Sequence, residues 1–400
     1  MTMTHEPVSE EAAARLVQAA AAARAPLVIR GGGTRSLGLA APEADMLSSA
    51  GLNGIVAYNP AEMTMTARAG TPLGAIEAAL AEKRQMLSFE PPHMAGLLGR
   101  AGASTIGGVF AANASGPRRF VAGAARDSLL GLRFVNGRGE IVKSGGRVMK
   151  NVTGLDLVKL VAGSRGSLAF VTEVTFRVLP LPETAATVVV SGLTDAEATA
   201  AMATALSMPV EVSGAAQLPE SVRGRFLSGT LPEGAATVLR IEGLAASVSV
   251  RVEKLRAAMA AFGAVAVLPA AETDALWREV RDASPYADGS LRPLWRVSVA
   301  PAAGHQLVAA LRLEAGIDAF YDWQGGLVWL RMEADPEAGL VRRYIKALGG
   351  GHATLVRAPE ALLATTPVFE PQGEAIAALT ARIKQKFDPV GIFTVSDSQE

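Results

Sequence analysis

The sequence contains no cysteine among its 400 residues. This absence excludes disulfide bonds, thiolate zinc sites and cysteine-ligated iron–sulfur clusters within the chain. If the protein moves electrons, any iron–sulfur relay must lie on a partner. Histidine is also scarce, at four residues, and these are too dispersed to hold a metal ion, so we expect no metal site.

A net charge and a long uncharged apolar run are absent as well. Lys plus Arg and Asp plus Glu each number 38, so no overall electrostatic field attracts nucleic acid or a membrane surface. No uncharged stretch approaches the length of a membrane span. Glu6, Glu10 and Glu11 stand where a secretory signal would carry positive charge. We therefore expect a cytoplasmic protein that reaches the inner face of the cell membrane only through partners.

The first half of the chain holds two stretches rich in glycine. The first, GGGTRS at residues 31–36, follows a short apolar strand predicted at 27–30. A Rossmann motif would need glycine where Ser36 stands, and no Lys-Ser/Thr pair follows as in a P-loop. Two interpretations remain: a nest of backbone N–H groups that binds a pyrophosphate, or a glycine-rich surface turn.

The second stretch, AGASTIGGVFAANASG at residues 101–116, has no charged side chain. Apart from Ile106, Val109, Phe110 and Asn113, its side chains are no larger than those of threonine or proline. So much small-residue backbone before a helical turn indicates a wall that a flat, partly anionic ligand approaches closely. We infer that this ligand is a flavin.

Patterns of strands and turns outline the rest of the first half. With half of its residues hydrophobic, a chain of this length can bury more than one core and should form two or three domains. Residues 129–135 and 140–144 flank an Asn-Gly-Arg-Gly turn and predict a hairpin, and residues 168–178 alternate as a half-buried strand. Pro180 and Pro182 then mark a domain boundary.

Four motifs occur over residues 8–182, in the order RGGGTRS, AGASTIGGVFAANASG, RDSLLGLRFVNGRGEIV and KNVTGLDLVKLVAGSRGSLAFVTEVTFRV. In this order they resemble the FAD-binding domain of the vanillyl-alcohol oxidase and para-cresol methylhydroxylase (PCMH) family. Four motifs together are far more specific than any one of them. Two further segments, FEPPH and KFDPVGIF, are similar to those of the FAD-binding subunits of bacterial glycolate oxidase, which are short members of this family.

The resemblance implies an α+β fold in three parts. A PCMH-type FAD-binding domain of two subdomains would occupy residues 1–182, and a smaller α+β cap domain would occupy residues 183–358. Residues 359–400 would return to the FAD domain. The strand and helix patterns that alternate from about residue 185 to 355 suit such a cap.

The resemblance also implies which residues bind FAD. They are Arg30, Gly31, Gly32, Gly33, Thr34, Arg35, Ser36, Pro91, Thr105, Gly107, Gly108, Asn113, Gly116, Gly163, Ser164, Gly166 and Val171. Covalent members of the family carry histidine where this chain has Thr34, so FAD should be bound non-covalently. Many members carry tyrosine where this chain has Leu155, and Asn-Pro-Gly where it has Thr-Val-Ser at 394–396, so two usual flavin contacts are altered.

Four residues are candidates for chemistry on a substrate. Because a flavin takes up a hydride itself, the protein needs a base for a hydroxyl and a cation for a carboxylate. His93, in a segment that the family places near the flavin, and His352 are candidate catalytic histidines. Arg296, and also Arg331, lie on predicted strands and could bind a carboxylate. The alternatives are a solvated histidine and a salt-bridged arginine.

The resemblance implies the FAD-binding subunit of a glycolate oxidase (dehydrogenase) complex. Such a subunit would support oxidation of glycolate, a small 2-hydroxy acid, and pass electrons toward an iron–sulfur subunit and quinone. Members that oxidise 2-hydroxy acids alone carry a G-H-x-G-D-G-N-x-H segment, which has no match here, so the substrate would bind on a larger FAD-binding subunit. Two alternatives are a free-standing FAD-dependent 2-hydroxy-acid dehydrogenase and a flavin-free structural subunit.

Overall fold

The structure is a computed structural model that describes residues 2–38, 44–146 and 155–395. The chain forms two compact units. The first unit comprises residues 1–115, 122–180 and 371–400, and the second unit comprises residues 116–121 and 181–370.

These units differ from the predicted domains in three places, the smallest of which is a boundary after Pro180 instead of residue 182. The segment Gly116–Val121 leaves the first unit and belongs to the second. The C-terminal return begins at Pro371 rather than at residue 359. The physical reason is that Leu355 N donates a hydrogen bond to Val368 O at 2.8 Å, which keeps this segment on the sheet of the second unit.

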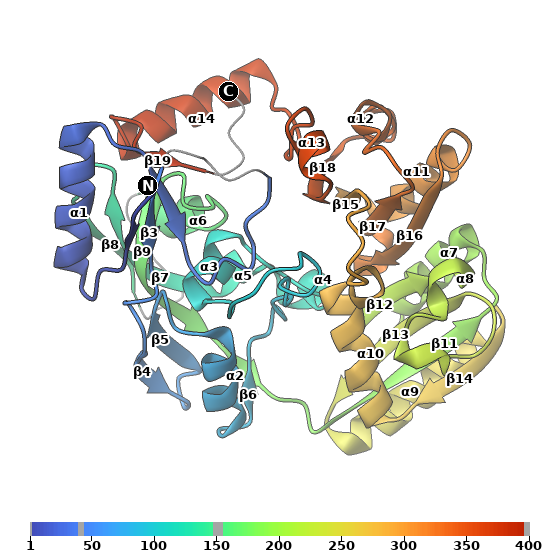
Figure 1. The fold of residues 1–400 in the computed structure, drawn as a ribbon. Helices are drawn as coiled ribbons and strands as arrows, with labels where there is room; N and C mark the ends of the chain where they lie inside the picture. The colour runs from blue at the N-terminus through green and yellow to red at the C-terminus, as the bar shows by residue number, and fades with distance from the viewer. Residues whose placement is uncertain (1, 39–43, 147–154, 396–400) are drawn as a thin grey trace. The chain divides into compact units, whose positions relative to one another are not determined.

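The first unit contains a five-stranded antiparallel sheet and a four-stranded parallel sheet (Figure 1). In sheet order, the five strands are β4 (Ile55–Asn59), β5 (Thr64–Arg68), β9 (Ala169–Arg177), β7 (Leu129–Asn136) and β8 (Ile141–Gly145). The four strands are β1 (Thr4–His5), β3 (Asp45–Ser48), β2 (Leu27–Arg30) and β19 (Phe393–Thr394), and β6 (Gln85–Met86) pairs with β10 (Leu179–Pro180). Strands β7 and β8 pair around the Asn-Gly-Arg-Gly turn, so the predicted hairpin is confirmed.

The helices of the first unit pack on these sheets. They are α1 (Glu10–Ala23), α2 (Leu73–Ala81), α3 (Ile106–Ala111), α5 (Ala125–Ser128), α6 (Leu157–Val161) and α14 (Glu374–Phe387), and α4 (Arg119–Ala122) ends where the chain re-enters this unit. Helix α3 is held by aromatic rings: the centroid of the Phe110 ring lies 5.5 Å from those of Phe89 and Phe176. These contacts fix the glycines of α3 in place.

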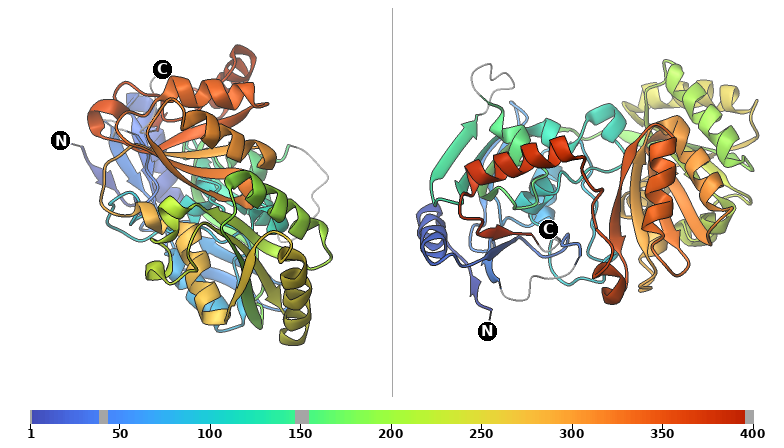
Figure 2. Two further views of the ribbon diagram at one scale, coloured as in Figure 1. Left: turned by 90° about the vertical axis from the view of Figure 1, so that its right-hand side faces the viewer. Right: turned by 90° about the horizontal axis from the view of Figure 1, so that it is seen from above.

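The last strand of the parallel sheet comes from the C-terminal end of the chain. Phe393 pairs with Leu27 and Thr394 with Val28, so β19 continues the sheet beside β2. Figure 2 shows α14 and β19, both red, next to one another in the first unit. The predicted return of the C-terminal segment thus ends within a few residues of the first glycine loop.

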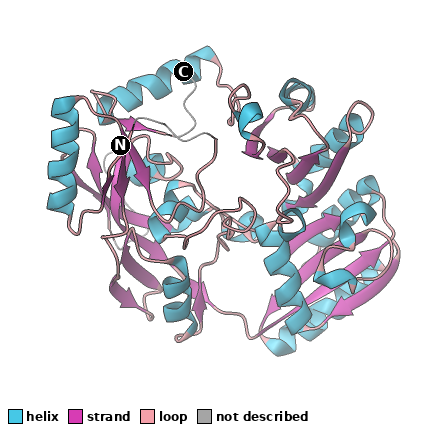
Figure 3. Cartoon of the chain, in the orientation of Figure 1, coloured by secondary structure: helices cyan, strands magenta, loops and turns pink. Residues whose placement is uncertain are grey.

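The second unit is an eight-stranded antiparallel sheet with helices on it (Figure 3). In sheet order, its strands are β14 (Ala264–Leu268), β11 (Thr184–Ser191), β13 (Ala236–Gly243), β12 (Val212–Leu218), β16 (Ile317–Asp322), β17 (Leu327–Met332), β15 (Leu294–Val299) and β18 (Gly351–Arg357). Its helices are α7 (Asp195–Ser207), α8 (Glu220–Arg223), α9 (Ala245–Met259), α10 (Ala270–Asp282), α11 (Gly304–Leu311), α12 (Ala338–Ala347) and α13 (Glu360–Leu363). The mixed architecture agrees with the predicted α+β class. Within the described ranges, none of the helices combines the length and the hydropathy needed to cross a bilayer.

Candidate cofactor site

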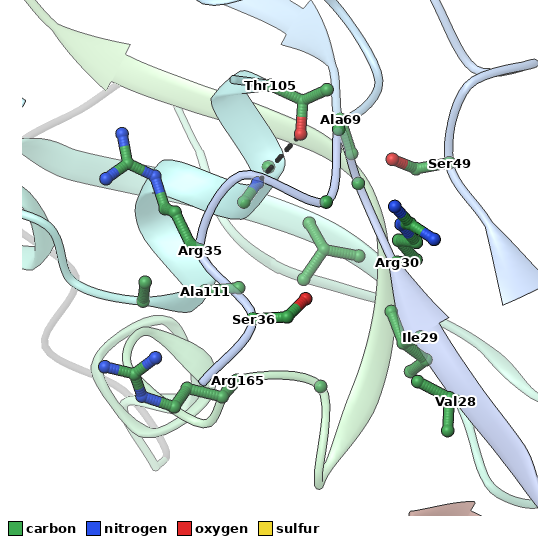
Figure 4. Close-up of a pocket in the computed structure, with 18 of the residues that line it drawn as sticks. Val28, Ile29, Arg30, Arg35, Ser36, Ser49, Ala69, Thr105, Ala111 and Arg165 are labelled. Atoms are coloured by element: carbon green, nitrogen blue, oxygen red, sulfur yellow. Dashed lines mark hydrogen bonds between the residues drawn. The ribbon is translucent and has the colours of Figure 1, made fainter. Parts of the chain in front are cut away.

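The first unit contains a cleft whose walls come from distant parts of the sequence (Figure 4). The lining residues are Val28, Ile29, Arg30, Gly31, Gly32, Gly33, Thr34, Arg35, Ser36, Leu37, Ser49, Ala69, Thr105, Gly107, Gly108, Ala111, Ala112, Arg165, Gly166, Ala169, Phe170, Val171, Thr394 and Val395. The open space in the cleft, including the part that reaches solvent, is about 930 Å³.

The first glycine loop forms one wall because side chains would not fit there. A Cβ atom at Gly32 would overlap the carbonyl oxygen of Ala103, and one at Gly31 would overlap the hydroxyl of Thr105. Gly33 has φ +69°, a conformation that favours glycine. Among the described residues, none accepts a hydrogen bond from the N–H groups of these three glycines. The loop can therefore offer backbone donors to an anionic ligand, as the nest interpretation requires.

Three arginines add positive charge to the cleft. Arg30, Arg35 and Arg165 line it, and no acidic side chain is among the described residues that do so. Figure 4 shows their side chains around the glycine loop. Arg35 Nη2 also donates to the carbonyl of Pro92 at 2.6 Å, which ties the loop to the segment before His93. Guanidinium groups bind phosphate oxygens well, so the cleft suits a ligand with a pyrophosphate.

Helix α3 contributes a flat wall rather than hydrogen-bond donors. The N–H groups of Ile106 and Gly107 donate to the carbonyls of Thr71 at 2.9 Å and Ala69 at 2.8 Å. The N–H of Gly108 donates to Oγ1 of Thr105 at 3.3 Å. Because these amides already have partners inside the unit, the second glycine-rich stretch offers a surface of glycine and small side chains against which a planar ring can pack.

Five residues implied by the resemblance do not line the cleft: Pro91, Asn113, Gly116, Gly163 and Ser164. Gly116 belongs to the second unit. Asn113 has φ 48°, and its Oδ1 accepts from Arg126 N at 2.9 Å, so it connects the turn after α3 to the start of α5. Gly163 N donates to Phe110 O at 3.1 Å, and Ser164 O accepts from Ser167 Oγ at 2.7 Å. Asn113, Gly163 and Ser164 therefore shape the turns beside the cleft.

The cleft also has walls that the sequence did not indicate. Arg165 stands between two implied residues but was not singled out, and Ser49 and Ala69 follow strands without any motif. Thr394 and Val395 line the cleft although they replace the family's usual C-terminal residues. The third residue of that segment, Ser396, lies outside the described residues. Strand pairing between β19 and β2 places this segment at the site.

His93 lies in the first unit but outside the cleft lining. Its Nε2 is 3.5 Å from Oε1 of Glu77 on α2, and 38% of its side chain is exposed. The position agrees with a partly solvated loop histidine. Its catalytic role stays a prediction.

Arg296 and His352 come together in the second unit. Arg296 pairs with Thr354 and Ser298 with His352 across β15 and β18, so both side chains belong to one face of the sheet. Burial lowers the pKa of His352, and the charges of Arg296 and Arg119 lower it further. The guanidinium carbons of these two arginines lie 4.8 and 4.7 Å from the ring centroid of Trp323. The sequence did not single out Arg119.

Arg331 is confirmed as a salt-bridged arginine. Its Nη1 lies 2.6 Å from Oδ2 of Asp288, and its Nη2 lies 3.2 Å from Oδ2 of Asp318. Only 9% of its side chain is exposed. The guanidinium therefore connects strands and loops within the second unit, and its role there is structural.

Comparison with known proteins identifies the family. Residues 2–145 match the family described as FAD binding domain. Over 380 residues, the chain is 31% identical to glycolate oxidase subunit GlcE of Escherichia coli (strain K12), which covers 92% of this chain and 91% of that protein. The chain belongs to the GlcE family. FAD is therefore its cofactor, and the resemblance found in the sequence is confirmed.

Two further similarities concern parts of the molecule or its fold. Glycolate oxidase subunit GlcD of Bacillus subtilis (strain 168) is 33% identical over 181 residues, which cover 44% of this chain and 37% of that protein. A solved structure of alkyldihydroxyacetonephosphate synthase superposes with a TM-score of 0.69 at 17% identity, covering 99% of this chain and 77% of that one. The fold of this chain is thus the PCMH-type FAD-binding fold, as predicted.

Proposed function

We propose that this chain is the FAD-binding subunit of a glycolate oxidase complex and holds its FAD non-covalently in the cleft of the first unit. The observation that carries the proposal is similarity to a glycolate oxidase subunit along nearly the whole chain, together with a cleft lined by a glycine loop and three arginines that suit a pyrophosphate. Thr34 stands at the family's covalent attachment position and cannot form the histidyl bond. We expect FAD to be released when the protein is denatured.

The lining residues have complementary roles toward FAD. The N–H groups of Gly31, Gly32 and Gly33 and the guanidinium groups of Arg30, Arg35 and Arg165 would hold the pyrophosphate. The wall of α3 would lie against a planar part of the cofactor. When bound, FAD supplies a hydride acceptor for the oxidation of a hydroxy acid. The protein's contribution is to bind and orient it.

The partners follow from what this chain does not contain. It lacks cysteine, so the iron–sulfur centres of a relay to quinone would lie on an iron–sulfur subunit. A larger FAD-binding subunit, related to GlcD, would bind glycolate or another small 2-hydroxy acid. This chain would then carry a second flavin within the complex.

A second candidate is a free-standing FAD-dependent 2-hydroxy-acid dehydrogenase. It is favoured by the position of Arg296 and His352 on one face of the sheet in the second unit, where they supply a cation for a carboxylate and a base for a hydroxyl proton. The lowered pKa of His352 keeps its imidazole neutral at neutral pH, as a base requires.

The visible spectrum of the purified chain separates these functions. It is recorded before and after anaerobic addition of glycolate or D-lactate, first alone and then with the larger subunit. Under the proposed function, the flavin stays oxidised until the larger subunit is added. Bleaching of the chain alone would establish the dehydrogenase, and a chain that binds no flavin would leave a structural role in the complex.

A further inference from the structure

A single lysine on α14 connects two walls of the cleft that lie far apart in the sequence. Lys384 Nζ donates to the carbonyl of Ser167 at 2.7 Å and to the carbonyl of Phe393 at 2.5 Å. It also donates to Oδ2 of Asp388 at 2.9 Å. An ammonium group has three donors, so these acceptors use all of them.

Asp388 organises the turn that follows α14. Its Oδ1 accepts from the N–H groups of Gly391 and Ile392, both at 3.0 Å, and its Oδ2 accepts from Phe393 N at 2.8 Å. The carboxylate is 0% exposed. Its charge is therefore balanced by these amides and by Lys384 rather than by water, which makes the turn depend on the ion pair.

The turn delivers the C-terminal wall of the cleft. Strand β19 begins at Phe393, whose amide is the last one that Asp388 binds, and Thr394 pairs with Val28 of β2. Thr394, Val395 and Val28 all line the cleft. Displacement of the turn would therefore move this wall.

The other acceptor of the lysine, Ser167, belongs to a turn that forms a second wall. Arg165 and Gly166 in this turn line the cleft and have φ values of 53° and 86°. Ser167 closes the turn, since its N–H and hydroxyl both bind the carbonyl of Ser164, at 2.9 and 2.7 Å. Lys384 thus ties a turn with an unusual backbone to β19.

We propose that Lys384 and Asp388 are positioning residues for FAD. Neither lines the cleft, but their ion pair sets the spacing between the wall at 165–171 and the wall at 394–395. The affinity for FAD therefore depends on a contact behind the site. This inference rests on the proposed flavin site in the first unit.

The test compares Lys384→Met with Lys386→Met, which removes an exposed lysine from the same helix. The apo chains are titrated with FAD, and the dissociation constant and the apo melting temperature are measured. We expect Lys384→Met to raise the dissociation constant roughly tenfold or more, because a partly buried, charged hydrogen-bond network is lost, and Lys386→Met to leave it unchanged. The visible spectrum of the bound flavin should also shift in Lys384→Met. A lower melting temperature with an unchanged dissociation constant and spectrum would overturn the inference.

A measurement on the unmodified chain covers the case in which Lys384→Met does not fold. Amide hydrogen exchange is followed with and without FAD, and FAD should slow exchange in residues 164–168 and 391–395 together. If FAD slowed exchange in residues 164–168 but not in residues 391–395, the chain would still bind FAD. That result would overturn this inference and leave the proposed function intact. A chain that binds no FAD would overturn the proposed function and this inference with it.

Discussion

Gly107 and Gly108 are neighbours on α3 but have different surroundings. A Cβ at Gly107 would lie 2.6 Å from the Cβ of Ala69, so this glycine allows α3 to approach the segment after β5. A Cβ at Gly108 would meet only the hydroxyl of Thr105, at 3.1 Å, and Gly108 lines the cleft. The first glycine serves packing, and the second keeps the cleft wall flat.

Gly108→Val should therefore remove FAD without unfolding the protein. The branched side chain would occupy space in the cleft, and we expect the flavin content of the purified chain to fall to roughly a tenth or less of the wild-type value. Gly74→Val on α2 is the control, because a Cβ there has no neighbour within 4 Å. Absorbance gives the flavin content, and far-ultraviolet circular dichroism checks folding. Normal flavin content in folded Gly108→Val would contradict the placement of the site.

A second prediction at this scale concerns His352. Burial and then the charges of Arg296 and Arg119 hold its pKa below the ordinary value of 6.5. Removal of a positive charge favours the protonated ring, so Arg296→Gln should raise the pKa of His352 in an NMR titration. Arg292→Gln, at an exposed position just before β15, should not change it. If both substitutions changed the pKa of His352 equally, the prediction that Arg296 in particular lowers this pKa would be contradicted.

At the scale of elements, the segment Gly116–Val121 is tied to the second unit by a buried ion pair. Arg118 contacts both carboxylate oxygens of Glu242 on β13, at 2.6 and 2.5 Å. Burial would raise the pKa of Glu242, but Arg240 and Arg118 outweigh it and lower this pKa to about 2. The segment that directly follows the cleft wall of α3 is thus anchored in a different unit.

Arg118→Met should destabilise the second unit strongly, because it leaves Glu242 buried beside one arginine fewer. We expect a loss of about 3 kcal/mol in the free energy of unfolding at pH 7. The stabilisation by ionised Glu242 is complete above its ordinary pKa of 4.5 and is lost as the pH falls toward 2, so the difference from wild type should shrink in this range. Urea unfolding at several pH values measures it. Arg256→Met, in the exposed pair with Glu253, is the control and should change the free energy of unfolding by less than about 0.5 kcal/mol. A similar loss in Arg118→Met and Arg256→Met would contradict the prediction.

At the scale of the whole molecule, the tryptophans report on one unit only. All four, Trp277, Trp295, Trp323 and Trp329, belong to the second unit, whereas the cofactor cleft belongs to the first. The chain passes between the units after Ser115, Val121, Pro180 and Glu370. A signal from the tryptophans therefore shows whether an event in the first unit reaches the second through the chain.

FAD should raise the melting temperature that tryptophan fluorescence reports. At 100 times its dissociation constant, a ligand stabilises the state that binds it by about 2.7 kcal/mol, which corresponds to a shift of roughly 2–4 °C. We expect this shift because the segment anchored by Arg118 directly follows α3, so the units should unfold together. If FAD stabilised the first unit but left the melting temperature from tryptophan fluorescence unchanged, the two units would unfold independently.

Several features of this protein are determined by its sequence alone. The hairpin of β7 and β8 follows from its Asn-Gly-Arg-Gly turn, and the three glycines at 31–33 indicated a loop that either binds a pyrophosphate or turns at the surface. The order of four motifs was enough to indicate the family and the cofactor. Each of these features depends on neighbours along the chain or on a pattern that can be read in one dimension.

Only the tertiary structure decided which residues meet. It brought Thr394 to the cleft through strand pairing with Val28 and set Arg119 beside the pair of Arg296 and His352. It also moved the start of the C-terminal return to Pro371. These outcomes depend on sheet edges, buried charge pairs and packing between segments hundreds of residues apart, and no local pattern in the sequence records them.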